Sequence, residues 1–225
     1  RNVRVEDAEV IGYGSSCTGI VAGYLGTNAL ECLIENVYVS GTVSGIQQVG
    51  GIGGIFAKGT VRNCYADVKV IGSSRAGGIV AEPRNAVVVE NCFATGTLYS
   101  TGNAGGIAGG LNGNNPTIKG CIAWNEQIDG EPVSGRVIGW QSNTYTKATD
   151  CYAKKDMIIA WGPNKGMTGA DANTAGTYDW GNNKTAICHG ITTENSVDAA
   201  KKIGWSTDIW DLSGVTPLLK SFNDK

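Results

Sequence analysis

Four cysteines recur along the chain at nearly regular intervals, and their thiols are the side chains best suited to chemistry. Cys64, Cys92, Cys121 and Cys151 follow one another at steps of 28, 29 and 30 residues. Thiolates can ligate zinc or act as nucleophiles. Zinc sites, however, use closely spaced cysteine pairs or cysteines with histidines, whereas this chain has no C-x-x-C motif and one histidine, His189. We therefore expect no metal site and no bound cofactor.

The tripeptide around each cysteine favours packing over chemistry. It reads N-C-Y at residues 63–65 and N-C-F at residues 91–93, while an upstream copy at residues 36–38 reads N-V-Y. Valine can replace a buried thiol in an apolar core, but it cannot ligate a metal or attack a substrate. We expect the four recurring cysteines to form a buried ladder of free thiols.

Two further cysteines and the histidine offer weaker possibilities. Cys17 and Cys32 lie in a longer first copy of the repeat, where their thiols could form a disulfide. Cys188 and His189 are adjacent, so in a strand they would point to opposite faces and would not form a nucleophile–base pair. The zinc-peptidase motif H-E-x-x-H is absent from the chain.

The strongest enzymatic alternative is a polysaccharide-cleaving β-helix, either a hydrolase or a lyase, because such an enzyme would share a coiled repeat architecture. Polysaccharide hydrolases need clustered carboxylates around the scissile bond. This chain has no Asp-Asp pair, and residues 188–190 read C-H-G rather than the G-H-G of pectinase-like enzymes. We expect a protein that is not an enzyme, and we keep the polysaccharide-cleaving enzyme as the alternative.

A second motif keeps step with the cysteine tripeptide and reveals a repeat. Glycine-bounded apolar segments begin at residues 18, 50, 77, 105 and 135, at steps of 32, 27, 28 and 30 residues. They read TGIVAG, GGIGG, GGIVA, GGIAGG and GRVIG. Two independent motifs with one period indicate a structural repeat of 27–34 residues that extends over residues 1–155.

The residues between these glycines are typical of β-strands. Ile, Val, Thr and Tyr dominate them, and the spacing of an amphipathic helix is absent. Strands that recur at this interval without crossover helices predict a coil of parallel strands whose rungs stack at about 4.8 Å. We therefore predict an all-β, right-handed parallel β-solenoid, β-helix-like, of about five to six rungs.

Equivalent positions in successive rungs should form columns. Because alternate residues of a strand share a face, the cysteines should face the core and their neighbours should face outward. The outward column contains Tyr38, Tyr65, Phe93, Ile122 and Tyr152. We expect its aromatic members either to bind sugars or to be covered by another chain, although a bend at the preceding asparagine could reverse the assignment. A charged column of alternating sign, which should hold the rungs in register, contains Glu35, Arg62, Glu90, Lys119 and Thr149.

The period is lost after residue 155, and residues 156–225 are expected to form a C-terminal capping region. Residues 195–204 predict one short helix, with Asn195 as N-cap and Gly204 as C-terminal stop. Trp161 and Trp180 lie among polar loop residues and are candidates for stacking on sugars. The residues expected to close the core of the last rung are Trp205, Trp210, Leu212, Leu218 and Leu219.

The composition argues against several classes of partner. The 225 residues carry a net charge of −2 with mixed signs, whereas a nucleic-acid-binding protein needs a basic face. No apolar run approaches the roughly 20 residues of a membrane span, so we expect no membrane insertion within this segment. The sequence starts at Arg1 without an apolar leader, and we expect it to be part of a longer chain.

The repeat resembles a known family. The segments VGGIGGIFAKGTVRNCYADVKV and AGGIVAEPRNAVVVENCFATGTL are similar to the GLUG repeat of large bacterial surface proteins. These include adhesins and the non-catalytic regions of IgA-cleaving peptidases. The resemblance covers residues 36–153 closely and residues 10–35 more loosely.

The resemblance implies a β-solenoid at a bacterial cell surface and supplies no catalytic residues. We expect a non-catalytic extracellular adhesion or interaction module that presents a rigid surface to a glycan or to a host or bacterial surface protein. A structural spacer within a larger surface protein is a further alternative.

Overall fold

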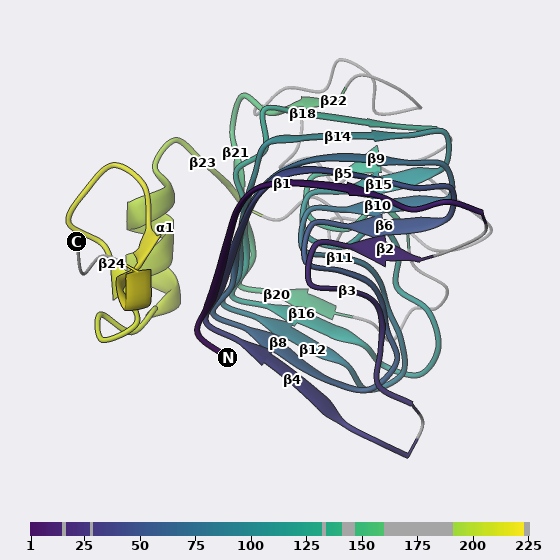
Figure 1. Cartoon of the computed structure of the whole chain (residues 1–225). Helices are drawn as coiled ribbons and strands as arrows, with labels where there is room; N and C mark the ends of the chain where they lie inside the picture. Colours follow the sequence, from purple (N-terminus) through teal and green to yellow (C-terminus); the bar gives the residue numbers. More distant parts are fainter. Residues whose placement is uncertain (15–16, 28, 132–133, 141–146, 160–190, 223–225) are drawn as a thin grey trace.

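The chain coils into a stack of parallel strands in which each of the first three turns adds strands to the same four sheets (Figure 1). The next two turns add strands to three of these sheets and join the fourth through isolated bridges. A computed structural model describes all residues except 15–16, 28, 132–133, 141–146, 160–190 and 223–225. The fold is an all-β parallel β-solenoid of about five turns with one short helix near the C-terminus, which confirms the predicted fold class. The right-handed sense stays a prediction from the general rule for parallel crossovers.

The largest sheet has ten strands and forms one long face of the solenoid. Its strands are β1 (Val3–Ile11), β5 (Val37–Ser44), β9 (Tyr65–Gly72), β13 (Phe93–Thr95), β14 (Thr97–Ser100), β17 (Ile122–Ala123), β18 (Gln127–Gly130), β21 (Tyr152–Lys154), β22 (Ile158–Ile159) and β23 (Ile191–Thr193). The fourth and later rungs contribute two short strands to this sheet where earlier rungs contribute one long strand. The parallel sheet continues beyond residue 155 through β22 and β23, while the division into two regions at that residue stays a prediction.

Three smaller parallel sheets complete the solenoid. The first contains β2 (Thr18–Gly19), β6 (Gln48–Gly50), β10 (Arg75–Gly77), β15 (Asn103–Gly105) and β19 (Ser134–Gly135). The second contains β3 (Ala22–Leu25), β7 (Gly53–Phe56) and β11 (Val80–Pro83). The third contains β4 (Cys32–Glu35), β8 (Gly59–Arg62), β12 (Val88–Glu90), β16 (Thr117–Lys119) and β20 (Lys147–Thr149).

The asparagine of each tripeptide sits at a corner of the coil. Asn36, Asn63 and Asn91 have φ angles of 53°, 52° and 51°, in the left-handed region. Gly120 and Asp150 take the same position in the next two rungs, with φ angles of 58° and 51°. Gly, Asn and Asp are the residues that tolerate this conformation best. The repeat therefore keeps these residue types because the backbone turns here from one sheet into the next.

The paired glycines of the second motif lie where successive rungs come closest together. A Cβ added to Gly51 would lie 2.2 Å from the carbonyl oxygen of Gly78, and one added to Gly78 would lie 2.0 Å from that of Gly106. Real Cβ atoms cannot approach so closely, so a side chain here would force the rungs apart. The paired glycines therefore recur once per rung because each rung must approach the next closely at this position.

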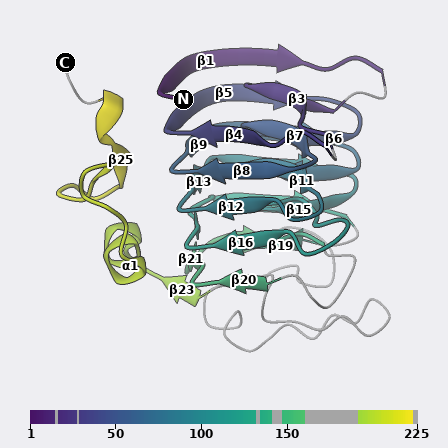
Figure 2. The ribbon, with the colours of Figure 1, turned by 90° about the horizontal axis from the view of Figure 1, so that it is seen from below.

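The C-terminal residues fold against the side of the solenoid. They comprise helix α1 (Ser196–Ile203), strands β24 (Trp210–Asp211) and β25 (Leu218–Leu219), and a 3-10 turn (Lys220–Phe222). Asn195 caps the helix by accepting hydrogen bonds from the Val197 and Asp198 amides, and Gly204 ends it with a φ of 85°, as predicted. Figure 2 shows this part beside the stack, with α1 next to β21 and β23 and the chain running back toward β1. We call residues 195–222 the side segment.

The side segment and the outward column form a second hydrophobic core outside the solenoid. Trp205 and Trp210 are almost completely buried, and their rings stack 4.3 Å apart. The indole nitrogen of Trp205 donates to the Gly120 carbonyl at 2.8 Å. At the other end, Arg4 of the first rung donates to the Phe222 carbonyl at 3.3 Å. The side segment therefore contacts the solenoid from its first rung to its last described rungs.

This arrangement corrects one expectation. Trp205, Trp210, Leu212 and Leu219 are buried against the side of the solenoid rather than over its last rung, while Leu218 is 43% exposed. The physical reason is that the outward column offers an apolar surface along the whole stack, which these residues cover.

Candidate functional site

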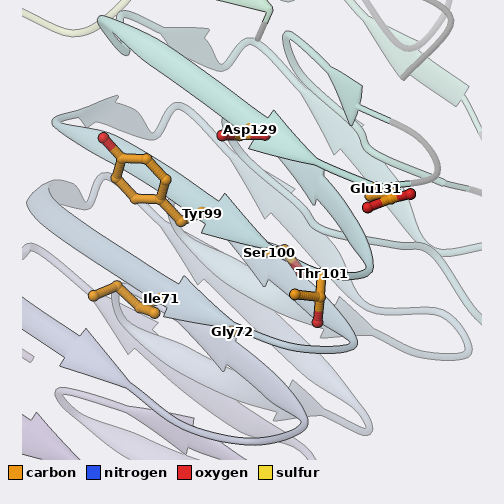
Figure 3. Close-up of a pocket in the computed structure, with 7 residues that line it drawn as sticks. All are labelled: Ile71, Gly72, Tyr99, Ser100, Thr101, Asp129 and Glu131. Carbon is orange, nitrogen blue, oxygen red and sulfur yellow. The ribbon is translucent and has the colours of Figure 1, made fainter. Parts of the chain in front are cut away.

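A shallow pocket of about 320 Å³ opens on the outer face of the ten-stranded sheet (Figure 3). It spans three consecutive rungs at the ends of β9, β14 and β18. The residues that line it are Ile71, Gly72, Tyr99, Ser100, Thr101, Asp129 and Glu131. Figure 3 shows the side chains of Tyr99, Asp129 and Glu131 on two neighbouring strands and the turn that follows β18.

Strand register places the main residues of this pocket in one column. Tyr99 pairs with Ile71 on one side and with Asp129 on the other. Their neighbours Leu98 and Ile128 are completely buried in the solenoid core. Because successive residues of a strand face opposite sides, the core positions of these two residues direct Tyr99 and Asp129 outward.

The pocket presents more hydrogen-bond acceptors than donors. The carboxylates of Asp129 and Glu131 can only accept, and within the described part of the chain neither forms an ion pair. The Thr101 hydroxyl already donates to the Ser73 carbonyl at 3.1 Å, which leaves its oxygen free to accept. The Ser100 hydroxyl accepts from the Gly102 amide at 3.0 Å, which leaves its proton free to donate.

The aromatic ring and an isoleucine supply the apolar part of the pocket. Ile71 is 37% exposed, and the Tyr99 ring is half-buried beside it. The ammonium nitrogen of Lys69 lies 5.7 Å from the centre of the Tyr99 ring, within the range of a cation–π interaction. The pocket thus combines an aromatic surface with oxygen acceptors, as many small-ligand sites do.

The aromatic residues predicted from the sequence as a binding stripe occupy a different place. Phe93 is completely buried and Tyr65 is 8% exposed under the side segment, while Tyr38 and Tyr152 are half-buried. Burial raises the pKa of Tyr65 to about 12, the Thr95 hydroxyl opposing this shift. The column is covered, but by the side segment of the same chain rather than by another chain as expected. The expectation of an exposed aromatic stripe that binds sugars is therefore corrected.

The other predicted binding residues, Trp161 and Trp180, lie outside the described residues.

The recurring cysteines line the solenoid core. Cys64, Cys92 and Cys121 are completely buried, Cys151 is 3% exposed, and all four are free thiols. The Cys92 sulfur contacts the carbonyl oxygens of Glu90 at 3.2 Å and of Val61 in the rung before at 3.8 Å. Burial raises the pKa of the Cys92 thiol.

The disulfide considered between Cys17 and Cys32 is not formed. Both residues are free cysteines, and the Cys17 thiol instead donates to the Gln48 side-chain oxygen at 3.4 Å. Cys17 precedes β2 and Cys32 begins β4, so the two lie on different sides of the first rung. That separation is why the expectation fails.

A buried carboxylate that the sequence reasoning missed joins three rungs. The Glu82 side chain is completely buried and pairs with Arg75 and Arg84. Gln48 of the rung before donates to it at 3.2 Å, and Asn112 of the rung after donates at 2.9 Å. With these donors the carboxylate serves as a structural clamp between rungs. The signal was present in the sequence, because E-P at residues 82–83 breaks the repeat pattern.

The sequence reasoning also missed Tyr99, Asp129 and Glu131. Aligning TLYS at residues 97–100 with QIDG at residues 127–130 by the repeat would have placed the tyrosine and the aspartate side by side. In the described part of the chain, no group of three or more His, Cys, Asp or Glu side chains could hold a metal ion. Nor does that part contain a helix long and apolar enough to cross a membrane.

Comparison with known proteins supports the fold. No protein-family model matches the chain, and no curated protein matches it. One similar solved structure is a protein from Bacteroides ovatus described as "a putative immunoglobulin A1 protease", with a TM-score of 0.72 and 24% sequence identity. The match covers 93% of this chain and 65% of the other chain. This likeness shows a shared β-solenoid fold, and the resemblance to the GLUG repeat stays an expectation.

Proposed function

We propose that this chain is a non-catalytic, extracellular adhesion module of a bacterial surface protein and that it binds a glycan at the Tyr99 pocket. One observation carries the proposal: an outward aromatic ring lies among oxygen acceptors on a flat, regular sheet. Sugar rings present apolar C–H faces that pack on aromatic rings, and hydroxyls that donate to carboxylates. The structural likeness to a bacterial protein is consistent with a bacterial source.

The strand pairing supports the proposal because it makes the pocket rigid. β14 is hydrogen-bonded to β9 on one side and to β18 on the other, so three rungs hold Ile71, Tyr99 and Asp129 in a fixed register. A preorganised site loses little conformational entropy when a ligand binds. A sugar that makes only a few contacts with this pocket can therefore still bind.

A polysaccharide-cleaving enzyme is the second candidate, and a specific observation favours it. Asp129 and Glu131 are two carboxylates in one pocket, which is the minimal equipment of a glycosidase. A glycosidase general acid, however, is usually buried against apolar groups so that it holds its proton near neutral pH. Glu131 is exposed and Asp129 is only half-buried. The binding module is therefore the better account of this pocket.

One experiment separates the two functions. The purified chain is applied to a glycan array, and the release of reducing ends is measured on the polysaccharides of the same array. Binding without cleavage, weakened by Tyr99→Ala, supports the adhesion module. Cleavage that Asp129→Asn or Glu131→Gln abolishes would establish the enzyme instead. If the chain neither binds nor cleaves any glycan of the array, both functions are contradicted, and a protein-binding module or a spacer is left.

A further inference from the structure

The charge and hydrogen-bonding character of the pocket restrict which glycan it can hold. Asp129 and Glu131 bring two negative charges to its wall, and Lys69, on the far side of Tyr99, brings one positive charge. A uronic or sialic acid would place a third carboxylate among these acceptors, where like charges repel. A ligand rich in donors would instead complement them.

Lys69 gives an independent indication of the preferred donor. Its ammonium group already lies within cation–π distance of the Tyr99 ring, which shows that the ring attracts a protonated amine. Lys69 is exposed, so its flexible side chain can withdraw when a ligand arrives. A ligand amine at the opposite side of the ring, toward β18, would lie beside the column partner of Tyr99, the carboxylate of Asp129.

We infer that the pocket selects a glycan that carries a free, protonated amino group, such as a chain of de-N-acetylated hexosamines. The inference rests on the proposed function and deepens it. The sugar ring packs on Tyr99 and Ile71, and its ammonium group is held between the Tyr99 ring and the carboxylates of Asp129 and Glu131. N-acetylation would remove the charge and the preference with it.

The test compares two probes that differ only in this group. A β-1,4-linked glucosamine hexamer and the N-acetylglucosamine hexamer of the same linkage are titrated into the chain by calorimetry, at pH 6 and low salt. Each exposed carboxylate–ammonium pair contributes about a two- to fivefold gain in affinity. We therefore expect the glucosamine hexamer to bind about tenfold more tightly than its acetylated counterpart, with the difference shrinking at high salt.

Variants assign the preference to the pocket. The double variant Asp129→Asn/Glu131→Gln should abolish the preference, so that the two hexamers bind with affinities within about twofold of each other. Glu9→Gln is the matched control, because it removes one carboxylate from the same sheet, in β1, outside the pocket. That variant should change neither affinity.

The outcomes separate this inference from the proposed function. Equal affinities for the two hexamers, or a preference that survives in the double variant, would overturn the amine selectivity and leave glycan binding intact. Binding of other glycans on the array, with neither hexamer bound, would have the same consequence. No binding to any glycan would overturn the proposed function as well.

Discussion

Removing the Trp205 side chain should show how strongly the side segment is attached to the solenoid. Trp205 is 4% exposed, packs against Phe93 with ring centres 6.5 Å apart, and stacks on Trp210. Replacing a buried tryptophan with alanine typically costs about 3–5 kcal/mol of unfolding free energy. The lost hydrogen bond to the Gly120 carbonyl is part of that cost, at about 1 kcal/mol. We expect Trp205→Ala to lower the stability by about 3–5 kcal/mol.

Urea denaturation followed by far-ultraviolet circular dichroism measures this loss, and binding of a hydrophobic dye reports exposure of the outward column. Trp205→Phe keeps an aromatic ring and loses the hydrogen bond, so it should cost about 1–2 kcal/mol. Val215→Ala is the control, since Val215 is 91% exposed on the same segment. Wild-type stability and unchanged dye binding in Trp205→Ala would refute the placement of the side segment.

Three further predictions follow from buried groups. Burial raises the pKa of Tyr65 to about 12, so the folded state favours the protonated phenol. The contribution of Tyr65 to stability should be constant below about pH 10 and fall as the pH rises toward 12. Tyr65→Phe should lessen that alkaline loss in urea titrations at several pH values, and an unchanged pH profile would contradict the prediction. Glu82→Gln should lower the unfolding free energy by about 2–4 kcal/mol, because it leaves Arg75 and the partly exposed Arg84 without a counter-charge. A loss below about 0.5 kcal/mol, which is typical of a surface substitution, would argue against the buried clamp. The four ladder thiols should react with a thiol reagent only after unfolding, and rapid modification of the native chain would contradict their burial. Cys92→Val should stay folded, because valine holds the equivalent position one repeat upstream of the first ladder cysteine.

Most of the solenoid follows from the sequence because its two motifs report backbone constraints. The asparagine before the cysteine marks a left-handed corner, as Asn63 and Asn91 show, and only a few residue types tolerate that conformation. The paired glycines mark the closest approach of the rungs, as at Gly51 and Gly78. Each constraint recurs once per turn, so the period of the sequence is the period of the structure.

The side segment is harder to predict because its position depends on contacts between residues far apart in the chain. The apolar side chains of Trp205 and Trp210 predict that both residues are buried. The open end and the apolar side of the solenoid could bury them equally well. In the structure they pack against the side of the solenoid, where Phe93 and Tyr65 form the complementary apolar surface. Local sequence patterns carry no information on that choice.

The Tyr99 pocket was missed for a related reason. Tyr99, Asp129 and Glu131 belong to no motif, and they come together only when three rungs are stacked in register. An alignment of the repeat copies residue by residue would have brought the first two together. Glu131 lies beyond the end of β18, where the repeat no longer fixes the position of a side chain.

The most direct test of the account is a calorimetric titration of the best glycan from the array into three forms of the chain. They are the wild type, Tyr99→Ala and Tyr24→Ala, the last removing an exposed tyrosine from β3 on another sheet. Stacking on an aromatic ring contributes about 1–1.5 kcal/mol, so the account predicts that Tyr99→Ala weakens binding by about tenfold and that Tyr24→Ala leaves it unchanged. Equal affinities of the wild type and Tyr99→Ala, or no heat of binding from any glycan, would contradict it.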